Sequence, residues 1–273
     1  MENTNVSNGV ADTVAAETNT NGTAPSGADQ STAKGIEWDT YGPLLDIQAG
    51  LTPDYWENVD VLVEHAKATY PNHAEAQLRI CDVGAGTGNF TRAIAEAFPK
   101  SEVVHIEPNR HMNYIAQQKF ADDGLDNVKI VQSDFFAYDW QAQQWDIVIC
   151  VNALYMLSPQ SEALRIIRDS LRPQGFFYVV DFGREQDAKQ WFWYFLKNAV
   201  KGVNTKKYLQ SIPKWPDMIA QAREGGKTQV EGAWWMHETD EFGATLEAAG
   251  FQLQGLTACY CGFADRAICR PIE

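Results

Sequence analysis

The sequence predicts an α/β protein in which a doubly wound, mostly parallel sheet of seven strands carries helices on both faces. Three observations lead to this prediction. Short apolar segments alternate with amphipathic ones from Gly35 onward, which is typical of parallel strands joined by crossover helices. A glycine-rich turn follows the first apolar segment. The last two apolar segments lie too close together for a crossover helix, so we expect an antiparallel hairpin with the reversed strand at the sheet edge.

Each element follows from a local pattern. Two amphipathic helices are expected first, at 38–50 and 52–70, and the second has Thr52 as N-cap and Pro53 at its first position. The apolar segments predict strands at 78–83, 101–107, 128–134, 145–152, 175–182, 251–260 and 264–270. The segments between them predict helices at 88–99, 109–124, 158–171 and 239–250, the last capped by Thr239 and ended by Gly250.

Composition bounds the class of protein. The chain has 273 residues and a formal net charge of −14, which disfavours broad nucleic-acid binding. Residues 1–35 are polar and lack aromatic side chains, so we expect a disordered tail before one domain at 36–273. We find neither a signal-peptide pattern nor an apolar run long enough to cross a membrane. A cytoplasmic protein without a membrane partner is expected.

The cysteines predict no metal site and no disulfide framework. There are five, with no CxxC pair among them: Cys81, Cys150, Cys259, Cys261 and Cys269. Their odd number and the apolar surroundings of two of them indicate reduced thiols in or near the core. We expect no metal because no second cluster of cysteine or histidine has ligand spacing.

The glycine turn and two strand ends predict a ligand site. Gly84, Gly86 and Gly88 stand where a parallel sheet presents its carboxyl edge, and they let backbone N–H groups approach a ligand. Glu107 ends the second strand, where a carboxylate can accept hydrogen bonds from ribose hydroxyls. Asp134 ends the third strand, where a carboxylate can accept from an exocyclic amine. Alone, each pattern also fits a packed turn or a helix cap; together they indicate one crevice.

These residues resemble the motifs of the class I S-adenosylmethionine (SAM) dependent methyltransferases of the small-molecule type, over roughly residues 36–270. The resemblance implies a Rossmann-like fold and SAM as cofactor. It implies that `DVGAGTG` lines the methionine half of SAM through Asp82, Gly84, Ala85, Gly86 and Gly88. It assigns the ribose to Glu107, the adenine to Asp134 and Phe135, and the methionine portion also to Val151 and Asn152. Tyr41 resembles, more loosely, a tyrosine that family members place over the cofactor.

Other functions differ from this pattern in specific residues. Nicotinamide enzymes use G-x-G-x-x-G, whereas this turn reads G-x-G-x-G followed by Asn89. Adenine-N6 nucleic-acid methyltransferases usually carry N/D-P-P-Y/W after strand four, where this chain reads `VNAL`. A protein or RNA methyltransferase and a non-catalytic SAM-fold interaction subunit remain open, and the sequence predicts no oligomeric state.

The catalytic base is not singled out by the sequence. The resemblance implies in-line transfer of the methyl group to an oxygen or nitrogen nucleophile, for which positioning supplies much of the rate. Many relatives have a histidine after strand four, where this chain has Tyr155 and Met156. His237, Asp181 and Tyr155 are the candidate catalytic residues, and a structural role is open for each. Among the other histidines, His105 is expected in the core and His65 on the surface.

Residues 184–236 form a long insertion before the last helix, and we expect a substrate lid there. It holds nine basic and five acidic residues and five of the nine tryptophans. Trp191 and Trp193 on one side, with Trp234 and Trp235 on the other, are expected to wall an apolar pocket for a flat or aromatic acceptor. Its mouth could hold an anionic group through Lys201, Lys206 and Lys207. The alternative is a helical pair with its own small core and solvated lysines.

Overall fold

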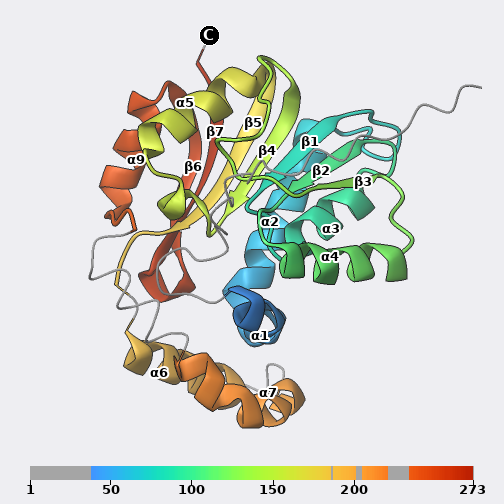
Figure 1. Ribbon diagram of the computed structural model, residues 1–273. Coiled ribbons are helices and arrows are strands. Elements are labelled where there is room, and N and C mark those ends of the chain that lie inside the picture. Colours follow the sequence, from blue (N-terminus) through green and yellow to red (C-terminus); the bar gives the residue numbers. More distant parts are fainter. Residues whose placement is uncertain (1–37, 186, 201–204, 221–233, 273) are drawn as a thin grey trace, which may run out of the picture.

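The sheet holds the reversed strand inside rather than at its edge. The computed structural model describes residues 38–185, 187–200, 205–220 and 234–272 (Figure 1). Its strands are β1 Arg79–Val83, β2 Glu102–Ile106, β3 Val128–Val131, β4 Trp145–Val151, β5 Leu171–Phe182, β6 Phe251–Cys259 and β7 Ala264–Pro271. Their order is β3-β2-β1-β4-β5-β7-β6, with β1 to β5 parallel.

The antiparallel hairpin of β6 and β7 is confirmed, but the predicted edge position of the reversed strand is wrong. β7 runs antiparallel to both of its neighbours, β5 and β6, and β6 is the edge strand. Burial explains the order. Ala264, Ala267 and Cys269 of β7 are fully buried, whereas most residues of β6 are at least partly exposed. The more apolar strand therefore takes the inner place.

Helices cover both faces of the sheet, as the doubly wound pattern predicts (Figure 1). On one face lie α2 Pro53–Thr69, α3 Asn89–Ala97 and α4 Arg110–Asp122. On the other lie α5 Gln160–Ser170 and α9 Thr239–Ala248. Each face has its own buried apolar cluster, one built around α2 and α3 and the other around α5 and α9. Between them, the two clusters bury both sides of the central strands.

Three helical elements lie beyond the carboxyl edge of the sheet. α1 Trp38–Leu51 packs against α4, where a Cβ added at Gly42 would make an ordinary contact with Ile115 Cδ1 at 3.4 Å. α6 Ala188–Val200 and α7 Thr205–Ser211 form a lobe beneath α1 (Figure 1), and Phe195 of α6 shares an apolar cluster with Ile47 and Leu51 of α1. The Tyr194 hydroxyl donates to Asp54 Oδ1 at 2.7 Å, which joins α6 to the start of α2. Short 3-10 turns follow β4 at Leu154–Met156, α7 at Ile212–Lys214 and β6 at Tyr260–Gly262.

The predicted N-cap of α2 is confirmed, whereas the predicted N-cap of α9 is wrong, since Glu238 takes that position. Thr52 stands at the N-cap position of α2, but its hydroxyl donates backwards to the Gln48 carbonyl oxygen at 2.8 Å. Thr239 is the first residue of α9, and its hydroxyl donates to Asp265 Oδ1 at 2.7 Å. In each case the hydroxyl donates to an acceptor outside the helix that it begins. Local propensity therefore predicted where the helix starts, and contacts with other segments determined the hydrogen bond of the side chain.

Two further expectations about burial need correction. Cys81, Cys150 and Cys269 are buried as expected, whereas Cys261 is exposed in the turn between β6 and β7. His65 is half-buried and packs edge-on against Phe176, with ring centroids 4.8 Å apart. The helix that carries it therefore turns this side chain toward the sheet. The predicted disordered tail at 1–35 lies outside the described residues.

Candidate cofactor and acceptor site

Glycine is needed for different reasons at the three positions of the turn. All have positive φ, which favours glycine: 60° at Gly84, 55° at Gly86 and 82° at Gly88. An added Cβ would come within 2.5 Å of Ala153 Cβ at Gly84, and within 2.6 Å of Phe120 at Gly88. At Gly86 it would meet nothing closer than Met112 Sδ, at 3.8 Å. Gly84 and Gly88 therefore serve packing, while the half-exposed turn at Gly86 leaves room for a ligand.

Glu107 fastens the end of β2 to this turn. Its side chain is 6% exposed, and Oε2 accepts from the Gly86 N–H at 2.9 Å. Oε1 accepts from the Asn109 N–H at 2.8 Å. Burial raises the pKa of Glu107, while these two N–H donors favour its ionised form. The carboxylate is thus held in a fixed orientation at the carboxyl edge, with lone pairs left for a ligand's hydroxyl groups.

Asp82 lies beneath the turn rather than at its surface. It is 1% exposed, and Oδ2 accepts from the Thr91 hydroxyl at 2.6 Å, which ties β1 to the first turns of α3. The same hydroxyl lies 3.0 Å from Nδ1 of His105, which is buried as expected. Burial raises the pKa of Asp82 to about 7. Its described contacts hold α3 in place, and direct contact with SAM stays a prediction.

The ends of β3 and β4 bring the other predicted cofactor residues to the same edge. Asp134 is half-buried and accepts from the Phe136 N–H at 2.9 Å, while Phe135 is buried. Val151 and Asn152 are both partly exposed at the end of β4. Asn152 has a φ of 54°, and its N–H donates to the Val180 carbonyl oxygen at 2.7 Å. The side-chain Oδ1 of Asn152 is buried and has no hydrogen-bond partner among the described residues, so it can accept a hydrogen bond from a ligand.

A network that the sequence did not predict holds α1 over the glycine turn. Lys119 Nζ on α4 donates to Asp46 Oδ1 at 2.7 Å, to Asn89 Oδ1 at 2.8 Å and to the Thr87 carbonyl oxygen at 2.9 Å. Asp46 belongs to α1, and its Oδ1 also accepts from the Thr87 hydroxyl. No short motif predicts this network, because three separate segments supply its residues. Tyr41 immediately precedes Gly42 on α1, and its side chain lies outside what the structure describes.

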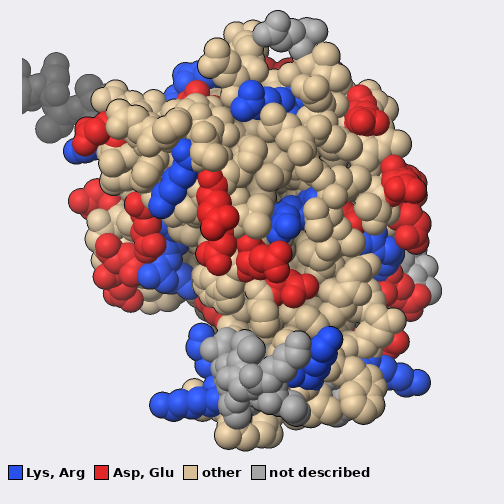
Figure 2. Space-filling model, turned by 180° about the vertical axis from the view of Figure 1, so that it is seen from behind, with Lys and Arg blue, Asp and Glu red and all other residues tan. Residues whose placement is uncertain are grey.

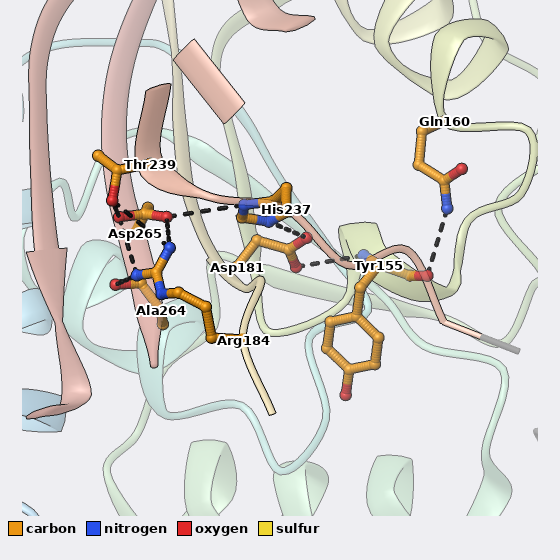
Figure 3. Close-up of polar contacts among 8 residues, drawn as sticks. All are labelled: Tyr155, Gln160, Asp181, Arg184, His237, Thr239, Ala264 and Asp265. Carbon is orange, nitrogen blue, oxygen red and sulfur yellow. Dashed lines mark hydrogen bonds and ion pairs between the residues drawn. The ribbon is translucent and has the colours of Figure 1, made fainter. Parts of the chain in front are cut away.

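The candidate catalytic residues meet at the end of β5 (Figure 3). Asp181 is fully buried, and its Oδ1 accepts from the Tyr155 N–H at 3.2 Å. His237 is also buried, with Nε2 3.7 Å from Asp181 Oδ2 and Nδ1 3.6 Å from Asp265 Oδ2. Burial raises the pKa of Asp181 to about 6, and the contact with His237 lowers it. The structure therefore brings His237, Asp181 and the backbone of Tyr155 together.

Asp265 and Arg184 complete this group and were not predicted. Arg184 donates to both carboxylate oxygens of Asp265, at 2.5 and 3.1 Å. The sequence held one signal for Asp265: a carboxylate at an inward position of an apolar strand, which needs a buried partner.

The predicted aromatic walls fall into two clusters. Trp234 lies against Tyr155, with ring centroids 4.6 Å apart, beside the half-buried Trp235. Trp191 stacks on Phe263 at 5.6 Å, whereas Trp193 is 65% exposed. No described contact joins the two clusters directly, and the pocket between them stays a prediction.

The lobe of α6 and α7 differs in charge from the body. Basic side chains (blue) surround this lobe in Figure 2, whereas acidic side chains (red) gather on the body above it. The exposed lysines on described residues of the lobe are Lys189, Lys197, Lys206, Lys207 and Lys214. Lys201 lies outside the described residues. A contact between these lysines and an anionic acceptor remains a prediction.

Comparisons with known proteins agree with this architecture. Residues 80–175 match a family model described as a methyltransferase domain. The ubiquinone/menaquinone biosynthesis C-methyltransferase UbiE of Ectopseudomonas mendocina is 30% identical over 108 residues, covering 39% of this chain and 42% of that protein. The match thus spans less than half of that relative. UbiE of Shewanella baltica is 28% identical over 214 residues, or 78% of each chain.

A solved structure shows the same fold. The SAM-dependent methyltransferase from Aquifex aeolicus aligns with a TM-score of 0.53 and 14% identity, over 86% of this chain and 98% of that one. In the part of the chain that the structure describes, no helix is long and apolar enough to cross a membrane. Residues 80–175 therefore match a methyltransferase domain, and the sheet that contains them has the fold of that solved structure.

Proposed function

We propose that this chain transfers the methyl group of SAM to a carbon atom of a small, flat acceptor that carries an ionisable hydroxyl group. The observation that carries methyl transfer is the Glu107 carboxylate, fixed against the Gly86 turn at the open carboxyl edge. The choice of carbon is supported by the names of the UbiE relatives, which are C-methyltransferases. It replaces the oxygen or nitrogen acceptor that the sequence led us to expect.

The described residues fit SAM in three places. Glu107 would offer oxygen acceptors to the two ribose hydroxyls, and Asp134 with Phe135 would contact the adenine at the neighbouring strand end. The unpartnered Oδ1 of Asn152 suits the N–H donors of the methionine ammonium group. SAM, when bound, supplies an electrophilic methyl group.

The chain's own contribution is to orient the acceptor, exclude water and move a proton. Tyr155 and Trp234 provide a buried apolar surface beside the ends of β4 and β5. Asp181 in this proposal takes the proton from the acceptor's hydroxyl, which makes the adjacent ring carbon nucleophilic. That carbon would take the methyl group as the methyl–sulfur bond of SAM breaks, with the electron pair going to sulfur, and its own proton would then pass to water. His237 has both ring nitrogens turned toward carboxylates, so it serves less well as the direct base.

The insertion is part of the proposal as a substrate cover. The insertion begins at Arg184, which binds Asp265, and it ends with Trp234 to Met236, directly before His237, which contacts the proposed base. Trp191, Trp193, Trp234 and Trp235 would contact the acceptor, and the exposed Lys206 and Lys207 would attract an anionic group to it. Because the body is acidic, we infer that the acceptor is a free small molecule rather than a nucleic acid. We also infer a cytoplasmic location.

The test combines product analysis with matched variants. The protein is incubated with SAM carrying a ¹³C-methyl group and a panel of hydroxyarenes and quinols, and labelled products are analysed by NMR. We expect a methyl carbon bonded to a ring carbon, formed by the wild type and by His73→Gln, and lost in Asp181→Asn. A label on oxygen or nitrogen would overturn carbon transfer alone. Binding of SAM without transfer to any small molecule would favour a macromolecular acceptor, and no SAM binding would favour a non-catalytic subunit.

A further inference from the structure

The buried group at the end of β5 has more acidic than basic side chains. Asp181 and Asp265 are fully buried, and Arg184 is the nearby permanent cation. Arg184 is engaged by Asp265 through two hydrogen bonds, and it also donates to the carbonyl oxygens of Gly262 and Ala264. Asp265 is further bound by the Thr239 hydroxyl. Asp181 is therefore left with His237 as its source of positive charge among the described residues that contact it.

His237 is held between the two carboxylates. Its ring stacks on Phe242 with centroids 4.5 Å apart and an interplanar angle of 14°, and Trp235 lies against it at 4.5 Å. The backbone N–H of His237 donates to the Gly183 carbonyl oxygen at 2.8 Å. An added Cβ at Gly183 would lie 2.3 Å from His237 Nδ1, so the chain also closes on the ring from that side. The ring therefore cannot swing away, and each nitrogen keeps its own carboxylate.

The charges decide the protonation of this group. With a neutral imidazole, the two carboxylates and one guanidinium carry one net negative charge in a buried place. With an imidazolium the group is neutral, and Nδ1–H and Nε2–H each face a carboxylate oxygen. Both ring nitrogens and Asp181 Oδ2 have no hydrogen-bond partner in the described structure, so a small shift of the ring would satisfy all three.

We propose that Asp265 holds His237 as an imidazolium, and that His237 in turn keeps Asp181 ionised so that it can take the acceptor's proton. Asp265 and His237 are then positioning residues, and the proposal rests on the proposed function for the role of Asp181. Four other residues face the buried group of Asp181, His237 and Asp265. They are Cys150 on β4, Tyr155 in the turn after it, Arg184 after β5 and Thr239 on α9. The opposing effects of burial and of His237 on the pKa of Asp181 agree with this arrangement.

The arrangement also ties the proposed base to the insertion. Arg184 begins the insertion and His237 directly follows its end, and both contact Asp265 on β7. The two ends are thus fixed to the sheet by the same carboxylate. A substitution at Asp265 is therefore expected to change both the charge of His237 and the position of the insertion at 184–236.

The first measurement needs no methyl transfer. Two-bond ¹H–¹⁵N spectra of the apoprotein at pH 7 report whether each histidine ring is neutral or charged, and His237→Gln identifies its signal. We expect His237 to be an imidazolium in the wild type and a neutral ring in Asp265→Asn, with His73→Gln leaving its signal unchanged. A neutral His237 ring in the folded wild type would overturn the proposal, whatever the activity.

The second measurement is the pH dependence of kcat. His237→Gln and Asp265→Asn should each move the acid limb upward by about one pH unit or more, because Asp181 then stays protonated to higher pH. SAM affinity should stay the same in both. A lower kcat with an unmoved acid limb in a folded variant would mean that the group only supports the fold. If either variant fails to fold, the wild-type spectrum decides.

Discussion

Asp82 offers a sharp test of how the core beneath the glycine turn is built. Its carboxyl is 1% exposed and accepts from Thr91, and burial raises its pKa from 3.8 to about 7. The folded protein therefore holds a proton that the unfolded chain releases as the pH rises above about 4. The free energy of unfolding should fall between pH 4 and pH 7 for this reason.

The size of the effect follows from the two pKa values. A separation from 3.8 to about 7 corresponds to a free energy on the order of 4 kcal/mol at 1.36 kcal/mol per pH unit. Asp82→Asn removes the titration and keeps the shape, and its amide oxygen can still accept from the Thr91 hydroxyl. The stability of the variant relative to wild type should therefore rise by about that amount between pH 4 and pH 8.

Urea unfolding at several pH values measures the difference, with tryptophan fluorescence as the signal. Asp139→Asn, a change at an exposed loop residue, is the matched control and should follow the wild-type curve. Parallel curves for Asp82→Asn and the wild type would show that Asp82 is ionised in the folded protein, which contradicts the reasoning from burial.

Three further predictions concern the surroundings of the cofactor and the acceptor. Gly86→Val should abolish SAM binding in calorimetry, because valine disfavours a φ of 55° and its side chain would fill the space left for the ligand. Retained methyl transfer would place the cofactor elsewhere. Lys119→Met should lower the free energy of unfolding by about 2–3 kcal/mol, because it leaves the α1 carboxylate of Asp46 without its cation, and an unchanged urea midpoint would refute this role. Trp193→Ala and Trp235→Ala should raise KM or lower kcat for the acceptor while SAM affinity stays the same; weakened SAM binding with unaltered acceptor kinetics would exclude the lid.

The fold was predictable where local pattern and topology agree. Alternating apolar and amphipathic segments predicted every described strand, because a parallel sheet buried on both faces needs such runs. The place of β7 was missed, since a hairpin between β6 and β7 does not say which of the two strands pairs with β5. Relative burial along the two strands decides it, and that depends on the finished core.

The site was predictable where a motif occupies one short segment. Glu107 and the Gly86 turn meet as the spacing indicated, because the ends of adjacent parallel strands share one edge. Lys119 and Asp265 were missed because their partners lie 73 and 81 residues away along the chain, so no local pattern connects them. The predicted cap at Thr239 was wrong for the same reason: its hydroxyl donates to the carboxylate of Asp265, 26 residues away along the chain.

The most direct test of the account is a calorimetric titration of SAM into the wild type, Glu107→Ala and Glu102→Ala. Glu102 is exposed at the start of β2, so its replacement controls for a general change in charge. Loss of Glu107 removes charge-assisted hydrogen bonds worth roughly 1.5–3 kcal/mol each, so SAM affinity should fall at least about tenfold with the fold intact by circular dichroism. We predict tight binding by the wild type and Glu102→Ala and weak binding by Glu107→Ala. Equal affinity in all three, or no binding by the wild type, would contradict the assignment of this edge of the sheet to the cofactor.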